Sequence, residues 1–336
     1  MKLDANIPKA IDRTAFESAA LETAGFDGIW IGETQHDPFL MSLRAVDATE
    51  RVTVGTGVAI AFARTPMTLA YSGWDLAGYS QGRFILGLGS QVRPHIERRF
   101  SMPWSQPAAR MRELVSALRA IWQSWSDESK LDFRGDFYTH TLMTPFFRPE
   151  RHDWGPPPVM LAGVGELMTE VAGEVAEGFL FHAFTTAEYL TQVSVPALIR
   201  GRAAGGGDGL GEFQLVGPVF TCCGRDEREL AAAIRGTKAQ IAFYASTPAY
   251  RPVLDCHGWG DVQPELTRLS KAGRWEEMGD VIDDTMLATF AVVGDPVTVG
   301  KGLNERWSGV ASRITLYTPY PCDRETLEAV AAAAKS

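Results

Sequence analysis

The stretch from residue 52 to residue 91 constrains the fold more than any other part of the chain. It opens with an apolar, β-branched run, 52–60, after which Thr65 and Pro66 provide an N-cap and a first-turn proline for a helix. A second apolar run, 84–88, follows soon after that helix. Two buried strands joined by a packed helix must be parallel, with a right-handed crossover, so this stretch predicts a βαβ unit.

The same alternation of strand and helix recurs along the whole chain. Eight apolar runs are found, at residues 2–7, 29–32, 52–60, 84–88, 159–162, 179–181, 213–222 and 312–317. Helical patterns lie between them and after the last, among others at residues 14–23, 39–49, 66–79, 108–124, 226–243, 295–307 and 324–334. Two irregular segments interrupt this rhythm, about 125–158 after the fourth strand and about 244–285 after the seventh, and the first is expected to hold a small hairpin. The pattern predicts an α/β fold, a single (β/α)8 TIM barrel formed by residues 1–336 as one domain. An open doubly wound sheet is the alternative, but it rarely carries eight such units.

Composition excludes several classes of protein. The chain has 336 residues, of which 45% are hydrophobic and 22% charged, and its formal net charge of −9 argues against a general binder of nucleic acid or membrane surfaces. The N-terminus lacks the apolar core of a signal peptide, and no stretch approaches the roughly 18 apolar residues of a membrane helix. We therefore expect a cytoplasmic protein. Its cysteines, at positions 222, 223, 256 and 322, form neither a zinc pattern nor a disulfide framework, so free thiols are expected.

Several motifs resemble those of the bacterial luciferase-like monooxygenase superfamily. They are the stretch 52–91, GFDGIWIGETQHDP at 25–38, FRGDFY at 133–138, PPPVMLAG at 156–163 and VAGEVAEGF at 171–179. Within that superfamily, the likeness is to the branch of coenzyme F420 (deazaflavin)-dependent oxidoreductases, in particular the actinobacterial type. The resemblance covers nearly the whole chain. It implies a cofactor at the C-terminal mouth of the barrel, a small-molecule substrate and a homodimer.

By this resemblance, the ring of the deazaflavin, or alternatively of FMN, lies against a cis, non-proline peptide bond at the end of the third strand. The matching bond is Gly57-Val58, and Ala59 follows it. An ordinary trans strand end, with glycine present for packing, is the alternative reading of these residues.

The end of the fourth strand is implied to line the ring or the ribityl chain. Its residues are Gly87, Gly89, Ser90 and Gln91, and the two polar side chains could form hydrogen bonds to the cofactor. A glycine-rich strand exit followed by polar surface residues explains the same sequence. The basic run that follows, Arg93, His95, Arg98 and Arg99, and more weakly Arg64, could attract an anionic cofactor tail, although a solvated basic loop explains the run equally well.

A glycine turn after the fifth strand is the expected phosphate site. Ala162, Gly163, Val164 and Gly165 lead into a helix, whose unpaired N–H groups and positive dipole end favour an anion. A tight βα turn alone would also explain this short GxG pattern. The dinucleotide pattern GxGxxG is absent, because position 168 is methionine. His182, just past the sixth strand, is a further cofactor-binding candidate, with a role in the core as its alternative.

Glu33 and His36 follow the second strand and are the candidates for catalysis. Because a barrel places strand ends around one mouth, a carboxylate and an imidazole there could transfer protons. A structural loop histidine is an equally good account of His36. The related sugar-phosphate dehydrogenases carry an Asp-His pair after the second strand and an acidic residue after the fourth. Glu33-Thr34 and Val92 stand at those places here, which makes that activity doubtful.

These observations predict an oxidoreductase in which a reduced deazaflavin (F420) exchanges hydride with an unknown small organic substrate. The nearest alternative keeps the fold but binds FMN and acts as a luciferase-like monooxygenase. A cofactor-binding homologue without activity is a third reading. A metal-dependent hydrolase would need ligands on several strand ends; only His36 and His182 are suitably placed and no HxH occurs, so no metal site is expected.

Overall fold

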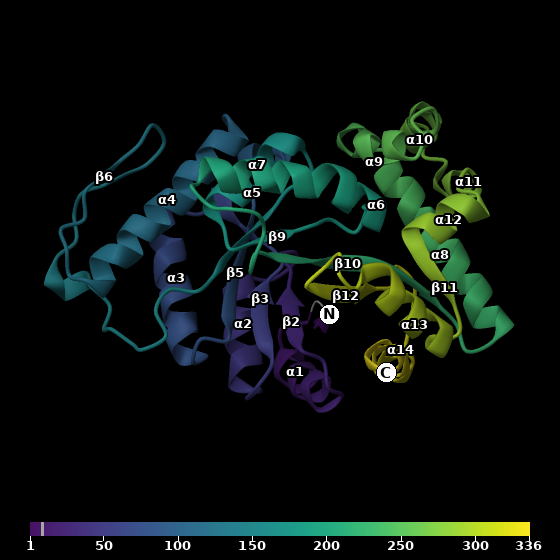
Figure 1. Ribbon diagram of the computed structural model, residues 1–336, viewed down its shortest axis with the longest axis horizontal. Coiled ribbons are helices and arrows are strands. Elements are labelled where there is room, and N and C mark those ends of the chain that lie inside the picture. Colours follow the sequence, from purple (N-terminus) through teal and green to yellow (C-terminus); the bar gives the residue numbers. More distant parts are fainter. Residues whose placement is uncertain (8–9) are drawn as a thin grey trace. The chain divides into compact units, whose positions relative to one another are not determined.

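A parallel sheet of buried strands is the centre of the fold (Figure 1), and the computed structural model describes residues 1–7 and 10–336. Its barrel strands are β1 (Lys2–Asn6), β2 (Gly28–Ile31), β3 (Thr53–Thr56), β5 (Phe84–Gly89), β8 (Val159–Ala162), β9 (Gly178–Leu180), β10 (Gln214–Cys223) and β12 (Arg313–Tyr317). They follow the order β10-β12-β1-β2-β3-β5-β8-β9, and β9 also pairs with β10. The sheet is thus a closed (β/α)8 barrel, which confirms the predicted fold class. Continuous apolar runs suit such strands because both faces are covered; every residue of β2 and of β5 is buried.

The third strand is interrupted where the resemblance places the cofactor ring. The predicted run 52–60 forms β3 and a separate short strand, β4 (Ala59–Ile60), and the peptide bond Gly57-Val58 between them is cis, as expected. β3 pairs with β2 and with the start of β5, whereas β4 pairs with the end of β5.

One strand is missing from the sequence-based assignment. β11 (Ala291–Gly294) pairs in parallel with the end of β10. Its apolar run continues directly from helix α12 (Asp284–Phe290), so the sequence shows no turn residue at its start. The sequence does indicate where β11 ends, because Asp295 and Pro296 form the N-cap and first turn of α13 (Pro296–Trp307).

The contacts of the chain divide it into two compact units. The first unit comprises residues 1–4, 181–196 and 215–336, and the second comprises residues 5–180 and 197–214. That residues 1–336 form a single domain stays a prediction.

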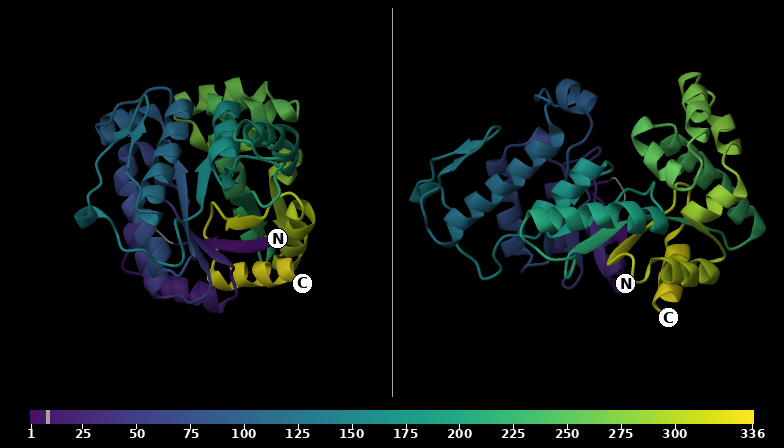
Figure 2. Two further views of the ribbon diagram at one scale, coloured as in Figure 1. Left: turned by 60° about the vertical axis from the view of Figure 1, so that its left-hand side comes forward. Right: turned by 45° about the horizontal axis from the view of Figure 1, so that its top comes forward.

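The second unit carries helices packed beside the strands β2, β3, β5, β8 and β9. They are α1 (Thr14–Thr23), α2 (Pro38–Asp47), α3 (Pro66–Tyr79), α4 (Pro107–Ser126), α5 (Glu166–Val175) and most of α7 (Val195–Ala204), with the short turns η1 (Ala61–Ala63), η2 (His95–Arg99) and η3 (Pro145–Phe147). α3 begins as predicted, with Thr65 in a capping box and Pro66 in the first turn. The loop after α4 holds the expected hairpin, β6 (Phe133–Arg134) and β7 (Thr139–His140), which Figure 2 shows.

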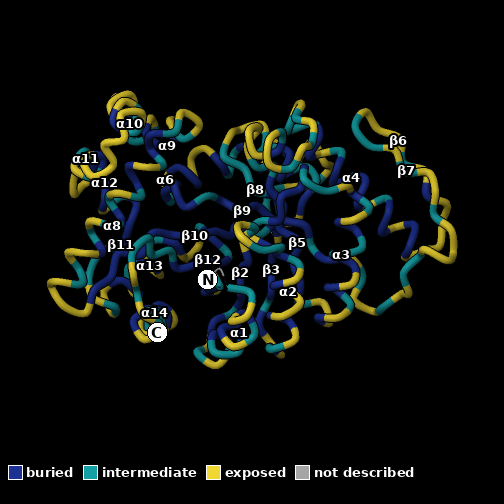
Figure 3. The backbone as a smooth tube through the Cα atoms, turned by 180° about the vertical axis from the view of Figure 1, so that it is seen from behind, coloured by how far each residue is buried: buried dark blue, intermediate teal, exposed yellow. Residues whose placement is uncertain are grey.

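The first unit contains the second irregular segment, about 244–285, which is largely helical. The helices and turns of the whole unit are α6 (Ala187–Tyr189), the π-helical turn η4 (Leu190–Ser194), α8 (Glu227–Ala245), η5 (Pro248–Tyr250), α9 (Arg251–Cys256), α10 (Val262–Lys271), α11 (Trp275–Asp280), α12, α13 and α14 (Arg324–Lys335). Short helices there pack on α8 around one apolar cluster that includes Phe184, Leu254 and Phe290. Figure 3 shows the barrel strands as largely buried and the outer faces of the helices as exposed, as are parts of the hairpin β6–β7.

Two further features of the chain are its thiols and the hydropathy of its helices. The four cysteines are free thiols, and two of them, Cys222 and Cys223, are buried. Within the described residues, no helix combines the length and the apolar character needed to cross a membrane.

Candidate functional site

The candidate residues of the second unit lie on neighbouring strands. β2, β3, β5 and β8 are parallel and adjacent, so their C-terminal ends meet at the same edge of the sheet. The register makes this concrete: Ala59 is paired with Leu88, and Leu88 with Leu161. The fold thereby brings together segments after residues 31, 56, 89 and 162 that are far apart in sequence.

The cis bond is held against the end of β2 on both sides. The Gly57 N–H donates to the carbonyl oxygen of Ile31 at 2.8 Å, and the Glu33 N–H donates to that of Val58 at 3.1 Å. Gly32 and Gly57 are both exposed, and a Cβ atom on Gly32 would lie 3.3 Å from the Gly57 oxygen. These two strand ends thus present a backbone surface without side chains.

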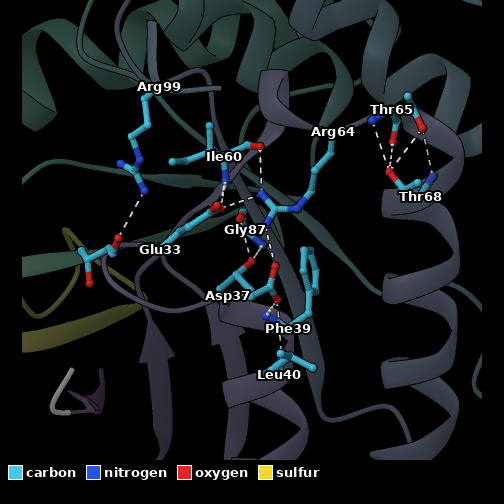
Figure 4. Close-up of polar contacts among 12 residues, drawn as sticks. Glu33, Asp37, Phe39, Leu40, Ile60, Arg64, Thr65, Thr68, Gly87 and Arg99 are labelled. Atoms are coloured by element: carbon cyan, nitrogen blue, oxygen red, sulfur yellow. Dashed lines mark hydrogen bonds and ion pairs between the residues drawn. The ribbon is translucent and has the colours of Figure 1, made fainter. Parts of the chain in front are cut away.

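The Glu33 side chain fixes the segment that follows the cis bond (Figure 4). Its Oε2 accepts a hydrogen bond from the Ile60 N–H at 2.7 Å and one from Arg64 Nη1 at 2.6 Å. The other end of the guanidinium donates to Asp37 Oδ2 at 2.7 Å, while Asp37 Oδ1 caps α2 by accepting from the Phe39 N–H. Only 7% of the Glu33 side chain and 17% of the Arg64 side chain are exposed, so this is a largely buried ion pair.

Arg64 is therefore committed to partners inside the protein. Burial works against its charged form, but the hydrogen bonds and charges of Glu33 and Asp37 outweigh it and raise the pKa of Arg64. The weaker hypothesis that Arg64 attracts an anionic cofactor tail is not supported by these contacts. Glu33 acts here as a positioning group, and its predicted part in proton transfer stays a prediction.

His36 lies in the same loop, between Glu33 and Asp37, and is half-buried. Across residues 1–7 and 10–336, no hydrogen bond or ion pair engages its ring. The imidazole is thus available to a ligand at this edge of the sheet, which leaves its catalytic role a prediction.

The glycines of β5 allow strands to approach each other closely. A Cβ atom on Gly87 would lie 1.9 Å from the Thr56 carbonyl oxygen, and one on Gly89 would lie 2.7 Å from Val58 Cγ2. Thr56 Oγ1 accepts from the Gly87 N–H at 2.9 Å and donates to the Gly87 carbonyl oxygen at 2.7 Å. Gly89 packs directly against Val58 of the cis bond. Both glycines therefore allow β5 to lie close to the segment 56–58.

Ser90 and Gln91 form local hydrogen bonds. Ser90 Oγ donates to the Gln91 carbonyl oxygen at 3.1 Å, and Gln91 Oε1 accepts from the Val92 N–H at 2.9 Å. Gln91 has a φ of +59°, so it turns the chain out of β5. The predicted contacts of these two side chains with a cofactor stay a prediction.

The turn after β8 leaves the start of α5 open. Gly165 is the N-cap, no side chain caps the helix, and a Cβ atom on Gly165 would meet nothing within 4 Å. Gly163, by contrast, lies close to Met168 and Phe179. Arg200 of α7 forms ion pairs with Glu166 and with Glu170, the latter at 2.7 Å. Its guanidinium therefore lies beside the first turn of α5.

His182 belongs to the first unit, where both of its ring nitrogens are occupied. Nδ1 accepts from the Phe184 N–H at 3.0 Å, and Nε2 lies 3.2 Å from the Tyr250 hydroxyl oxygen, with the two rings stacked at 4.8 Å. Burial lowers the pKa of His182 to about 4, so the ring is neutral at pH 7. Its predicted contact with a cofactor stays a prediction.

Sequence reasoning gave no role to three participants. Asp37 appeared only inside the motif at 25–38, and Arg200 carries no local signal, because its partners lie 30 or more residues away. Tyr250 was noted only as part of the second irregular segment, because its partner His182 lies 68 residues away. In the described part of the chain, no group of three or more His, Cys, Asp or Glu side chains is arranged to hold a metal ion.

Comparison with known proteins places this arrangement in a family. The model of the luciferase-like monooxygenase family matches residues 5–313. An uncharacterized protein of Mycobacterium tuberculosis is 56% identical over 314 residues, which cover 94% of this chain and 92% of the relative. The 5,10-methylenetetrahydromethanopterin reductase of Methanolobus tindarius is 25% identical over 312 residues, with 90% and 89% covered.

A solved structure shares the fold. The coenzyme F420-dependent tetrahydromethanopterin reductase from Methanopyrus kandleri superposes with a TM-score of 0.79 at 19% identity, over 98% of this chain and 96% of that one. The family match spans most of the barrel, including the interrupted third strand and the open glycine turn after β8. The chain therefore belongs to the luciferase-like monooxygenase family.

Proposed function

We propose that this chain is an oxidoreductase that uses coenzyme F420, as a hydride donor when reduced or as a hydride acceptor when oxidised, with a small organic substrate. The observation that carries the proposal is the exposed glycine backbone at Gly32 and at Gly57, which begins the cis bond, on the same sheet edge as the open start of α5. A flat ring can lie against backbone that has no side chains, and a phosphate fits unpaired amides at a helix start. When bound, the deazaflavin supplies the hydride chemistry, whereas the chain supplies binding and orientation.

In this proposal, the segment Gly57, Val58 and Ala59 supports the ring. Glu33 keeps that segment in place through Ile60 and Arg64. Gly87 and Gly89 contribute by letting β5 lie close behind it. Ser90 and Gln91, at the exit of β5, are proposed to lie along the ribityl chain, and the family resemblance supports this.

The anionic tail is assigned to residues 162–165 at the start of α5. The space over Gly165 and the lack of a side-chain cap suit an anion there. Arg200 adds no surplus positive charge there, because it pairs with both Glu166 and Glu170, so the assignment depends on the backbone amides. His36 is our candidate for proton transfer at the same edge, since its ring is not engaged by the protein.

The names of relatives support the choice of cofactor. The Methanopyrus kandleri reductase is named as coenzyme F420-dependent, and its fold matches nearly the whole chain. The family description favours a second candidate function, an FMN-dependent monooxygenase, which would use the same sheet edge.

Titration of the cofactor-free protein with F420 and with FMN separates the two. We expect F420 to bind with micromolar affinity or better, followed by its fluorescence, and FMN to bind more weakly. Micromolar binding of FMN with no affinity for F420 would remove the first proposal in favour of the second.

We also expect a homodimer, as the resemblance implies. Light scattering coupled to gel filtration should give a mass near twice that of the chain, and a mass near that of one chain at micromolar concentration would contradict this.

A further inference from the structure

The first unit holds a group of polar aromatic side chains that the proposed function has not used. We call it the tyrosine cluster, and its members are His182, Tyr244, Tyr250 and Tyr317. His182 follows β9, Tyr317 ends β12, Tyr244 lies near the end of α8 and Tyr250 ends η5. All four are half-buried, whereas the apolar residues behind them are fully buried. The cluster is therefore the polar, accessible edge of an apolar core.

The hydrogen bonds of His182 fix the direction of its contact with Tyr250. Because Nδ1 accepts from the Phe184 N–H, the neutral ring carries its proton on Nε2. Nε2 then donates to the Tyr250 hydroxyl oxygen at 3.2 Å. Within the described residues this is the only hydrogen bond of that hydroxyl, so the Tyr250 hydrogen atom remains for another acceptor.

The second pair of the cluster, Tyr244 and Tyr317, likewise has one hydroxyl hydrogen atom more than it uses. The hydroxyl oxygens of Tyr244 and Tyr317 are 3.2 Å apart, so one hydroxyl donates to the other and one hydrogen atom is left between them. Burial raises the pKa of Tyr250 to about 12 and raises that of Tyr317. Both tyrosines therefore remain hydroxyl donors at neutral pH.

The surroundings decide which acceptor suits these donors. Tyr250 stacks on His182 and lies against the buried ring of Phe184, with centroids 5.5 Å apart, and Tyr244 and Tyr317 each contact Phe220. Aromatic walls favour an apolar molecule, and unused hydroxyl donors favour one that carries an acceptor oxygen. A ketone, enone or aldehyde combines both properties.

We infer that Tyr250, oriented by His182, donates a hydrogen bond to the carbonyl oxygen of a neutral, apolar ligand at the tyrosine cluster. This is a binding site of the first unit by itself and goes beyond the proposed function. Tyr250 is the group that touches the ligand, and His182 is a positioning residue that acts through it.

The test compares two probes of similar shape, acetophenone and ethylbenzene, which differ by the carbonyl oxygen. Binding of each to the protein without added cofactor is measured by NMR titration, with acetophenone labelled with ¹³C at the carbonyl. We expect Tyr250→Phe to weaken acetophenone binding about tenfold, as the loss of one hydrogen bond does, and to leave ethylbenzene binding unchanged. The bound carbonyl resonance should move downfield in the native protein and not in the variant.

Controls separate a structural effect from the proposed contact. Tyr79→Phe, on an exposed helix face of the second unit, should change neither affinity. His182→Phe should weaken acetophenone binding, and His182→Gln, which restores an N–H donor, should recover part of it. Should Tyr250→Phe fail to fold, two measurements remain. They are the downfield shift of the carbonyl resonance when acetophenone binds to the native protein, and the affinity of Tyr317→Phe for acetophenone.

Equal affinity of the native protein and Tyr250→Phe for acetophenone would overturn the inference. So would a native protein that binds ethylbenzene as tightly as acetophenone. Because no cofactor is added, these results are distinct from a failure of the F420 titration, which would remove the proposed function instead.

Discussion

A substitution at Gly165 can test anion binding separately from the stability of helix α5. It has the extended conformation of an N-cap, φ −89° and ψ 155°, and there is room for a side chain. Aspartate is a favoured N-cap, so Gly165→Asp should keep or raise the melting temperature. Its carboxylate would occupy the amides and repel a phosphate, so we expect F420 affinity to fall at least tenfold, measured by fluorescence titration.

Asparagine at the same position is the matched control. Gly165→Asn caps the helix without a charge and should therefore lose less affinity than Gly165→Asp. Equal affinities for the native protein and the aspartate variant would contradict the phosphate assignment. Gly163 is a poorer site for this test, because a side chain there would also press on Met168 and Phe179.

His182 predicts how stability depends on pH. Its pKa is lowered to about 4 by burial, whereas an exposed histidine in the unfolded chain has a pKa near 6.5. The unfolded state therefore binds more protons between these values, and stability is complete above about pH 6.5 and falls as the pH drops towards 4. The slope should not exceed about 1.4 kcal/mol per pH unit. Denaturant unfolding at several pH values should show a flatter profile for His182→Gln, whose neighbours Tyr244 and Tyr250 are unchanged; an identical profile would contradict the assignment.

At this scale the sequence predicted positions better than partners. The cis bond at Gly57-Val58 and the open glycine turn follow from motifs that are contiguous in the chain. The partners of Glu33 are 27 and 31 residues away, and His182 meets Tyr250 across 68 residues. Such contacts depend on how strands and loops are brought together, which no local pattern contains.

Among the elements, the loop between β2 and α2 depends on the Glu33–Arg64 pair. Glu33→Ala would leave the Ile60 N–H and a largely buried guanidinium without their shared acceptor. We expect this to lower the free energy of unfolding by about 2–4 kcal/mol, measured with urea.

Glu97→Ala is the matched control for that change. Glu97 pairs with Arg93 one turn away on the protein surface, where water screens the interaction, so little should be lost. If both variants were equally stable, the Glu33 network would not hold the segment after the cis bond in place.

Elements with strong end signals were predicted closely. α1 has the predicted bounds, and α3 starts at the predicted cap. β11, α9 and α10 were not predicted individually, whereas a helix was expected at residues 275–285, where the structure has α11 and the start of α12. α9 has six residues, too few to show a helical period, and it packs against α10.

At the scale of the whole molecule, the most buried ion pair of the described residues joins β1 to β12. Asp4 of β1 is 0% exposed and Arg313 of β12 is 3% exposed, and the guanidinium donates to both carboxylate oxygens at 2.7 and 2.8 Å. Asp4→Leu alone should cost about 3–5 kcal/mol, because the buried guanidinium loses two charged hydrogen-bond acceptors. The double change with Arg313→Met should recover much of that loss.

Urea unfolding of the two variants and the native protein measures this coupling. A double variant no more stable than Asp4→Leu would contradict it. The closed barrel itself was predictable, because eight repeats of strand and helix leave few other architectures. The division of contacts into two units was not, because it depends on which loops pack on which strands.

The separation of these two residues along the chain also bears on how the protein is synthesised. β1 leaves the ribosome before its partner strand β12, with Asp4 and Arg313 309 positions apart. At 5–20 residues per second, the carboxylate and the strand edge beside it wait roughly 15–60 s for their partners. During that interval the nascent chain carries an unpaired strand edge of the kind that favours aggregation. Chaperones should therefore hold chains stopped before residue 313 and release chains that include β12.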